Sequence, residues 1–307
     1  MKKCFICTLA LLMIEVSGSL ASSLDITYRG TGISFGNSKR ISGIRLNFVD
    51  DGVEEVNGAN LTFWVPKKNP DAVVNGIALG LLGPEAKEIN GLALGGIGVA
   101  GDKIRGVSFG TVGVASDEIS GIAIGGIGLA ADRLDGIGFG TVGLAADDIN
   151  GIAVGGVGLA GKRLNGLFFG SVGLAADRIS GIAVGGMGVA AENMNGIALG
   201  GIGVAGEEIT GITIGGVGVA ATKITGLTVG GGELRSENLK GLAVGGFCRI
   251  KRNLSGVSIG IVNYAKRLNG VQLGVLNYCG NNPKLLRLLP IINVHINKKC
   301  CKPQDEH

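Results

Sequence analysis

The spacing of the large apolar residues repeats every fifteen residues over most of the chain. Residues 151–165 read GIAVGGVGLAGKRLN, and the same pattern recurs in strict register over residues 76 to about 264. If the first glycine of each unit is position 0, aliphatic residues or phenylalanine occupy positions 1, 3, 6, 8 and 13. Repetition at a fixed period predicts a stack of similar coils in place of a single globular core.

The apolar positions change parity within each unit. Positions 1 and 3 are odd and positions 6 and 8 are even, so one straight strand would mix apolar residues and glycines on both of its faces. A corner between the two pairs removes this conflict and predicts an all-β fold, a triangular β-solenoid of 15-residue coils. We expect positions 3, 8 and 13 to line the interior, with Ile152 and Val154 facing inward and Lys162 facing water.

A second pattern has a period of thirty residues, because phenylalanine occupies position 3 in alternate units, at Phe109, Phe139 and Phe169. In a solenoid, each ring would lie between smaller side chains of the coils before and after it. The same pattern also fits an antiparallel outer-membrane-type β-barrel, in which the two kinds of unit would be up and down strands. The parity change, the few aromatic residues and the uniform connectors favour the solenoid.

The regular units are flanked by less regular segments. Residues 1–21 are predicted to be a signal peptide, since Lys2 and Lys3 precede an apolar run from Cys4 to Ile14, and a small-residue cleavage site follows at residues 19–21. Residues 22–75 are predicted to be irregular N-terminal cap repeats, residues 76–264 the regular array, and residues 265–307 a C-terminal cap and tail. Irregular terminal repeats protect the open edges of an array. Trp64, the one tryptophan, has the alternative interpretation of a contact surface.

The composition narrows the functional classes. The chain has 59 glycines in 307 residues, but they are periodic and interleaved with aliphatic residues, unlike those of collagen or of disordered segments. The net charge of +4 comes from basic residues spread through the connectors. We therefore do not expect the chain to bind nucleic acid.

Glycine and serine motifs match two enzyme patterns. Gly96, Gly98 and Gly101 have the spacing of a dinucleotide-binding fingerprint, but another glycine-rich bend follows where that motif needs a helix. Ser108 and Ser258 each lie in a Gly-x-Ser-x-Gly pattern typical of hydrolase nucleophiles. The two histidines of the chain lie beyond the array, so neither serine has an evident general base.

Position 11 is acidic in most units, at Asp102, Asp117, Asp132, Asp147, Asp177, Glu192 and Glu207. These carboxylates are expected to face water, where ion pairing with nearby cations is favoured over calcium binding. We predict that the protein is not an enzyme and has no cofactor, no metal site and no small-molecule substrate.

Four cysteines would remain after signal removal, namely Cys248, Cys279, Cys300 and Cys301. In an oxidising compartment they could form disulfides in any of three pairings, which stay open here. No His/Cys spacing is typical of zinc, so a C-terminal disulfide staple is favoured over a metal site.

The C-terminal units carry the phrases IGIVNY at residues 259–264 and LGVLNY at residues 273–278, followed by LLPIIN at residues 288–293. In these residues the chain resembles the bacterial surface-repeat-containing protein family, whose repeats have a similar glycine–aliphatic–asparagine phrase. The resemblance covers residues 76 to about 293, although the central units have glycine where that family has asparagine. It implies an envelope or surface location with no established activity.

These observations predict an exported, non-enzymatic structural protein of a bacterial cell envelope that presents a regular surface for adhesion or envelope interaction. Its partner in the envelope is unknown, nucleic acid is not expected, and contact with an outer membrane stays open. The expected location is the cell surface, the outer membrane or the extracellular space. The alternative is an outer-membrane β-barrel that acts as a channel or anchor.

Overall fold

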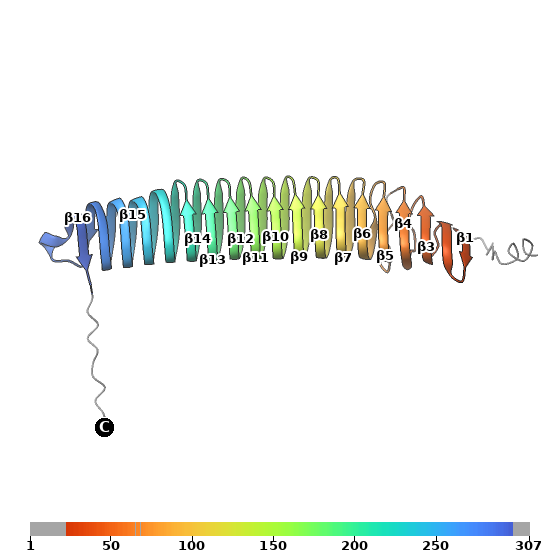
Figure 1. Cartoon of the computed structure of the whole chain (residues 1–307), viewed down its shortest axis with the longest axis horizontal. Helices are drawn as coiled ribbons and strands as arrows, with labels where there is room; N and C mark the ends of the chain where they lie inside the picture. The colour runs from red at the N-terminus through yellow and green to blue at the C-terminus, as the bar shows by residue number, and fades with distance from the viewer. Residues whose placement is uncertain (1–22, 65, 68, 297–307) are drawn as a thin grey trace, which may run out of the picture. The chain divides into compact units, whose positions relative to one another are not determined.

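The chain forms an all-β solenoid of about 13 stacked coils in a computed structural model (Figure 1). The structure describes residues 23–64, 66–67 and 69–296. The predicted signal peptide, Cys300 and Cys301 lie outside these residues. The chain divides into two compact units, Met1–Lys162 and Arg163–His307.

The first unit is built from short strands that lengthen toward the regular repeats. Its strands are β1 (Ser23–Tyr28), β2 (Thr31–Gly36), β3 (Arg40–Asn47), β4 (Glu55–Thr62), β5 (Val73–Gly80), β6 (Glu85–Gly95), β7 (Gly98–Gly110), β8 (Gly113–Gly125), β9 (Gly128–Gly140) and β10 (Gly143–Gly155). Strand β11 (Gly158–Gly170) includes the boundary between the units. The second unit contains β12 (Gly173–Gly185), β13 (Gly188–Gly200), β14 (Gly203–Gly215), the long β15 (Gly218–Cys279), the 3-10 turn η1 (Lys284–Leu286) and β16 (Leu288–His295).

The coils pair in parallel, as a solenoid requires. In the first unit, β8 and β9 align each residue with its equivalent fifteen positions later, for example Gly121 with Gly136. Strands β6 to β10 run in the same direction in Figure 1. In the second unit, β12 to β15 are parallel in the same way. The solenoid prediction is confirmed, and the antiparallel barrel is wrong because neighbouring strands of such a barrel would run in opposite directions.

The glycine at position 0 sets the register of the coils. Gly121 and Gly136 have φ values of +129° and +136°, a backbone conformation that L side chains rarely adopt. A Cβ added to Gly136 would lie 2.1 Å from the carbonyl oxygen of Gly121 in the preceding coil. The column of glycines therefore permits a backbone contact between coils that any side chain would prevent.

Three ladders of side chains fill the interior of the first unit. Position 13 supplies Leu134 and Ile149, both fully buried, and position 8 supplies Leu129 and Leu144, which are 3% and 2% exposed. The third ladder comes from position 2, where Ala123 is fully buried. Positions 8 and 13 line the interior as predicted, and the acidic residues at position 11 face water as predicted.

The expectation that positions 1 and 3 face inward is wrong. Ile152 and Val154 are partly exposed, while Ala153 between them is fully buried. In this coil the space beside position 2 is already filled by other side chains, because a Cβ added to Gly138 would lie 2.5 Å from Leu134 Cδ2 and 2.8 Å from Leu144 Cδ1. Two aliphatic ladders fill the interior, so the third side contributes small residues and turns its large ones outward.

The second unit repeats this arrangement and adds larger interior residues. Ile179, Val189 and Ala183 occupy positions 13, 8 and 2, and they are buried like their equivalents in the first unit. Phe168, at position 2, is fully buried, whereas the next residue, Phe169, is 41% exposed. Alternation along the strand thus separates two adjacent phenylalanines between the interior and the surface.

Antiparallel strands cover the first and last parallel strands. In the first unit β1 pairs antiparallel with β2, and in the second unit β16 pairs antiparallel with the end of β15. Inside the second unit, the buried Asn263 donates a hydrogen bond to Asn277 Oδ1 at 2.8 Å, and Asn293 donates to the Asn277 carbonyl at 3.0 Å. The buried amides give the last coils a polar interior in which Asn277 and Asn293 are hydrogen-bonded, whereas Asn263 Oδ1 and both side-chain polar atoms of Gln272 have no hydrogen-bond partner among the described residues.

We predict that the inward and outward apolar positions differ sharply in their tolerance of charge. Leu134→Asp places a carboxylate in the interior and should lower the free energy of unfolding by about 4 kcal/mol, the cost of an uncompensated buried charge. Ile137→Asp in the same strand, β9, is the matched control and should cost less than about 1 kcal/mol, because Ile137 is 42% exposed. Chemical unfolding followed by circular dichroism measures both values. Equal destabilisation would contradict the interior described here.

A second prediction concerns the removal of one coil. Deleting residues 121–135 joins two equivalent coils and places Phe109 beside Phe139. Because both rings face outward, the deletion should avoid the penalty of about 1–3 kcal/mol that overpacking of an interior would carry. The shortened chain should fold as readily as one that lacks residues 121–150, judged by thermal melts. A variant that folds only after the longer deletion would refute parallel, equivalent coils.

Candidate functional site: an apolar outer face

The outward side chains of positions 1 and 3 form two apolar ladders on one side of the coils. In the first unit, Val107 aligns with Ile122, and Phe109 aligns with Ile124 and then Phe139. Phe109 and Phe139 are 41% and 40% exposed. The thirty-residue pattern therefore places each ring beside a branched aliphatic residue, as predicted, but on the surface instead of in the interior.

A third apolar row lies at the bend that follows these ladders. Position 6 is occupied by residues that are about half exposed: Ile97, Val112, Ile127, Val142 and Val157. Backbone hydrogen bonds continue through this bend, since the Ile127 amide donates to the Val112 carbonyl at 2.7 Å. Positions 1, 3 and 6 together make an apolar surface without charged residues, which we call the apolar face.

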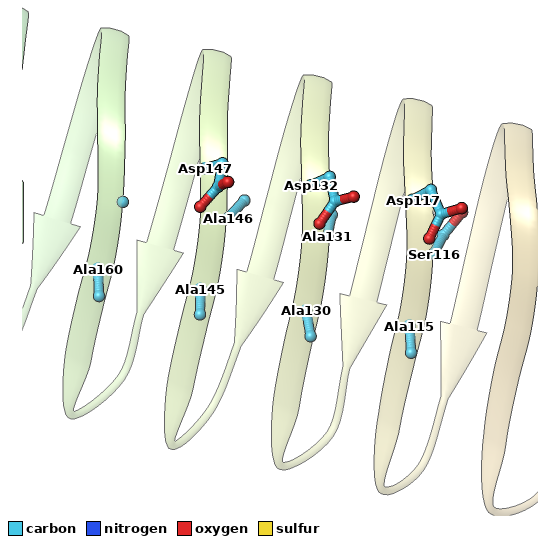
Figure 2. A pocket seen from close by; sticks show the side chains of 11 residues that line it. Ala115, Ser116, Asp117, Ala130, Ala131, Asp132, Ala145, Ala146, Asp147 and Ala160 are labelled. Atoms are coloured by element: carbon cyan, nitrogen blue, oxygen red, sulfur yellow. The ribbon is translucent and has the colours of Figure 1, made fainter.

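The next side of the coil is lined by alanine and bordered by carboxylates. In Figure 2, the alanines of position 9, including Ala130 and Ala145, form one row, and Asp117, Asp132 and Asp147 form a second. They line an open groove of about 550 Å³. Lys162 pairs with Asp147 at 2.7 Å at the end of this row. The small side chains make this side flat, in contrast to the apolar face.

The carboxylate row is a solvated surface feature. Equivalent carboxylates on neighbouring coils are about 4.8 Å apart, the spacing between paired strands. Within residues 23–64, 66–67 and 69–296, no group of three or more His, Cys, Asp or Glu side chains is arranged to hold a metal ion. The groove consequently offers repeated single charges and no convergent set of ligands.

The remaining side of the coil is polar. In the first unit, Lys103 pairs with Glu118 at 3.2 Å, and Arg105 pairs with Glu88 at 3.0 Å, in each case across neighbouring coils. Amide ladders continue the pattern, since Asn90 donates to Asn75 Oδ1 at 2.8 Å. Each coil therefore has one apolar, one alanine-rich and one polar side.

The serine and glycine motifs lie within the repeat architecture. Ser108 occupies interior position 2, is fully buried and donates a hydrogen bond to the Ile122 carbonyl at 3.4 Å. Ser258 is equally buried. Gly98 and Gly101 belong to strand β7, so a strand follows the fingerprint where a nucleotide site would have a helix. These residues are not brought together at an open cleft.

The first coils of the first unit contain a buried polar cluster. Arg45 occupies interior position 2, where later coils have alanine, and its side chain is fully buried. Its guanidinium pairs with Asp50 and donates to Asn60 Oδ1 at 2.8 Å and to Asn37 Oδ1 at 3.0 Å. Asp50 also accepts a hydrogen bond from Thr62 at 2.6 Å.

The ionised form of Asp50 is favoured in this cluster. Burial raises the pKa of its carboxyl group, but the charge of Arg45 and the hydrogen bonds from Thr62, Asn60 and Arg45 outweigh burial, so the pKa of Asp50 lies below its usual value. The pair makes a charged interior that is closed to solvent. Nothing in the sequence pattern marked Arg45 as buried, because its unit is irregular.

Trp64, the alternative contact residue of the N-terminal segment, lies on the surface. Its ring is 53% exposed and stacks on Phe48 with centroids 6.1 Å apart. The two rings form an exposed aromatic surface on the first coils. The interpretation of Trp64 as a contact surface stays a prediction.

The two described cysteines are interior residues. Cys248 and Cys279 are 2% and 0% exposed, and both are free thiols. Burial raises the pKa of Cys248 to about 11 and also raises the pKa of Cys279. Both thiols are therefore protonated at neutral pH and unreactive. A disulfide that involves Cys300 or Cys301 stays a prediction.

Comparisons with protein-family models, curated proteins and solved structures found no match to this chain. In the part of the chain that the structure describes, no helix is long and apolar enough to cross a membrane.

The apolar face was not predicted from the sequence pattern. Large residues at positions 1 and 3 suggested an interior, yet position 2 between them is almost always alanine, glycine, serine or threonine, and position 4 is glycine. Small residues at these alternate positions were the available signal, because they indicate a narrow interior on that side. The outward assignment follows once the small residues are placed inside.

The buried ion pair generates a prediction on stability and pH. Asp50→Asn keeps the shape but leaves Arg45 buried without a counter-charge, and it should cost about 3 kcal/mol at pH 7. Because the pKa of Asp50 is lowered in the folded protein, its contribution is present above the unfolded value of about 3.9 and is lost as pH falls through the folded pKa.

Unfolding measurements from pH 7 to pH 3 test this prediction, with Asp51→Asn as the control, since Asp51 forms an exposed pair with Lys67. The extra destabilisation of the Asp50→Asn chain should stay constant near neutral pH and begin to decrease as the pH falls below about 3.9 toward the lowered folded pKa of Asp50. An Asp50→Asn variant as stable at neutral pH as Asp51→Asn would contradict the charged interior.

Proposed function

We propose that the protein is an exported, non-enzymatic surface-repeat protein of a bacterial cell envelope. Its coils act as a scaffold that holds the apolar face toward a partner in the envelope. The single observation that carries the proposal is the outward apolar face itself. Phe109 and Phe139 lie on its position 3 ladder, and Ile127 lies in its position 6 row.

The extent of this face favours interaction over chance exposure. Six coils of the first unit, with about 4.8 Å per coil and about 3.3 Å per residue, give its positions 1 to 4 a planar area of about 380 Å². The position 6 row extends this area. Contiguous apolar surface of this size is typical of docking or membrane-proximal sites on soluble folds.

The regularity of the coils supports a structural role. Each coil repeats the same outward chemistry, so the surface changes little from coil to coil, as expected for a scaffold that holds a partner at many equivalent points. The motif serines support the same proposal, because Ser108 and Ser258 are buried in the interior. The alanine-rich and polar sides would remain in contact with water.

The envelope location rests on the first residues of the chain. Lys2 and Lys3, the following apolar run and the small-residue site at Ala21 have the order of a secretory signal. The resemblance of the C-terminal units to bacterial surface-repeat-containing proteins supports the same compartment.

Fractionation of bacterial cells that express the full chain tests the proposal. The protein should be recovered with the envelope, and Phe109→Ser combined with Phe139→Ser should shift most of it to the soluble fraction. The matched control is Ala115→Ser combined with Ala130→Ser, which changes exposed residues on the alanine-rich side and should leave the distribution unchanged. Recovery of the unaltered chain in the cytoplasm, or equal behaviour of both double variants, would refute the proposal.

A further inference from the structure

The last coils of the second unit differ from the rest of the array in charge. Between residues 238 and 296 the chain has no Asp or Glu. Eight basic residues lie in this stretch: Lys240, Arg249, Lys251, Arg252, Lys266, Arg267, Lys284 and Arg287. At the corner where central coils carry Asp or Glu, these coils carry Arg252 and Arg267. The corner therefore changes from acidic to basic along the array.

Several of these cations have no carboxylate partner within residues 23–64, 66–67 and 69–296. Arg252 pairs with Glu237 of the preceding coil at 3.3 Å. Among the described residues, by contrast, no ion pair is formed by Lys251, Lys266 or Arg267, and all three are exposed. Uncompensated charge of one sign on neighbouring coils produces a positive potential that attracts anionic surfaces.

A change in side-chain alternation places aromatic residues next to the cations. In the coil that begins at Gly256, Asn263 and Ala265 are buried, so Tyr264 and Lys266 point outward. Tyr264 occupies position 8 of its unit, and in the central coils the residue at position 8, for example Leu129, is buried. The change in alternation gives these coils an outward tyrosine on the side that is alanine-rich elsewhere.

The tyrosines form a stacked pair. The rings of Tyr264 and Tyr278, on successive coils, have centroids 4.9 Å apart and planes 4° apart. Tyr264 is 38% exposed. A tyrosine has an apolar ring and a polar hydroxyl group, which suits it to a boundary between apolar and aqueous surroundings.

An apolar groove is lined by residues that precede the tyrosines in each coil, whereas the cations follow them. It has a volume of about 730 Å³ and spans four coils, with a lining that includes Val229, Val244, Ile259, Ile261, Leu273 and Val275. Ile261 and Val275 are 58% and 65% exposed. Ile291 of β16 borders the groove with a φ of +68°, a strained conformation for a β-branched residue, and it is 76% exposed. Strained backbone is common at binding sites.

The order of these residues around one coil matches the layers of a bilayer surface. Ile261, Tyr264 and Lys266 follow one another as exposed apolar, aromatic and basic side chains. Apolar residues of interfacial proteins enter the acyl boundary, aromatic residues lie at the interface, and basic residues contact anionic headgroups. We propose that the C-terminal coils bind the surface of a lipid bilayer that contains anionic lipids.

Two other occupants fit this surface less well. A soluble polyanion would be held by the cations alone and would leave the groove and the exposed Ile261 and Val275 without a role. A second copy of this end would bring two surfaces of the same charge together, which disfavours association. Only an anionic amphiphilic surface complements both the cations and the groove.

This inference rests on the proposed function and specifies it, since it names an anionic bilayer as the envelope partner of the last coils. The test uses flotation of the full chain with vesicles of phosphatidylcholine that contain about 30% phosphatidylglycerol, compared with pure phosphatidylcholine. Every variant carries the same residues 1–22, so any contribution of that segment to vesicle binding is equal in all of them.

One variant set removes the cations and another removes the exposed apolar residues. Lys251→Gln, Lys266→Gln and Arg267→Gln together should weaken binding to the anionic vesicles about a hundredfold. Its control changes the net charge equally through Lys67→Gln, Lys87→Gln and Arg178→Gln, and it should bind like the unaltered chain. Ile261→Ser with Val275→Ser should weaken binding roughly tenfold, whereas Ala115→Ser with Ala130→Ser, at exposed positions on the alanine-rich side of the first unit, should not.

Circular dichroism establishes that each variant is folded before vesicles are added. Binding that is equal for anionic and neutral vesicles, or equal for the two charge-neutralised variants, would overturn the inference. Binding to dextran sulfate without binding to vesicles would overturn it in favour of a soluble polyanion. If vesicle binding fails while the unaltered chain still fractionates with the envelope, the inference alone is lost; if both fail, the proposed function is lost as well.

Discussion

The backbone contact at the glycine of position 0 is the constraint on which the coils depend. A side chain there would meet the carbonyl oxygen of the preceding coil, as the 2.1 Å separation for a Cβ on Gly136 indicates. The left-handed conformation of this glycine recurs in each coil of the array, and its close contact recurs in coils of both units. A repeat of this kind keeps equivalent residues opposite one another and turns each sequence position into a ladder.

Ladders give each side of a coil its own chemistry. Where Leu134 and Leu144 fill the interior between them, the third side holds small residues inside and turns large ones outward. The apolar face is thus a consequence of interior volume. Apolar side chains on neighbouring coils pack against one another along each outward ladder. This packing lowers the free-energy cost of exposing them to water.

The sequence predicted the features that depend on period and residue class. The repeat, the parallel coils, the inward positions 8 and 13 and the solvent-exposed acidic position all followed from spacing. The direction of positions 1 and 3 did not, because parity alone leaves two opposite assignments and interior volume decides between them. The buried Arg45 and the outward Tyr264 lie in irregular units, where the period gives no guidance.

The adjacent residues Phe168 and Phe169 offer the most direct test of this account, since one is fully buried and the other is 41% exposed. Hydroxyl-radical footprinting with mass spectrometry measures the solvent accessibility of each ring within one peptide. The account predicts strong oxidation of Phe169 and protection of Phe168 in the folded chain, with equal oxidation after unfolding. Protection of Phe169 together with oxidation of Phe168 would contradict the outward direction of position 3 and, with it, the apolar face.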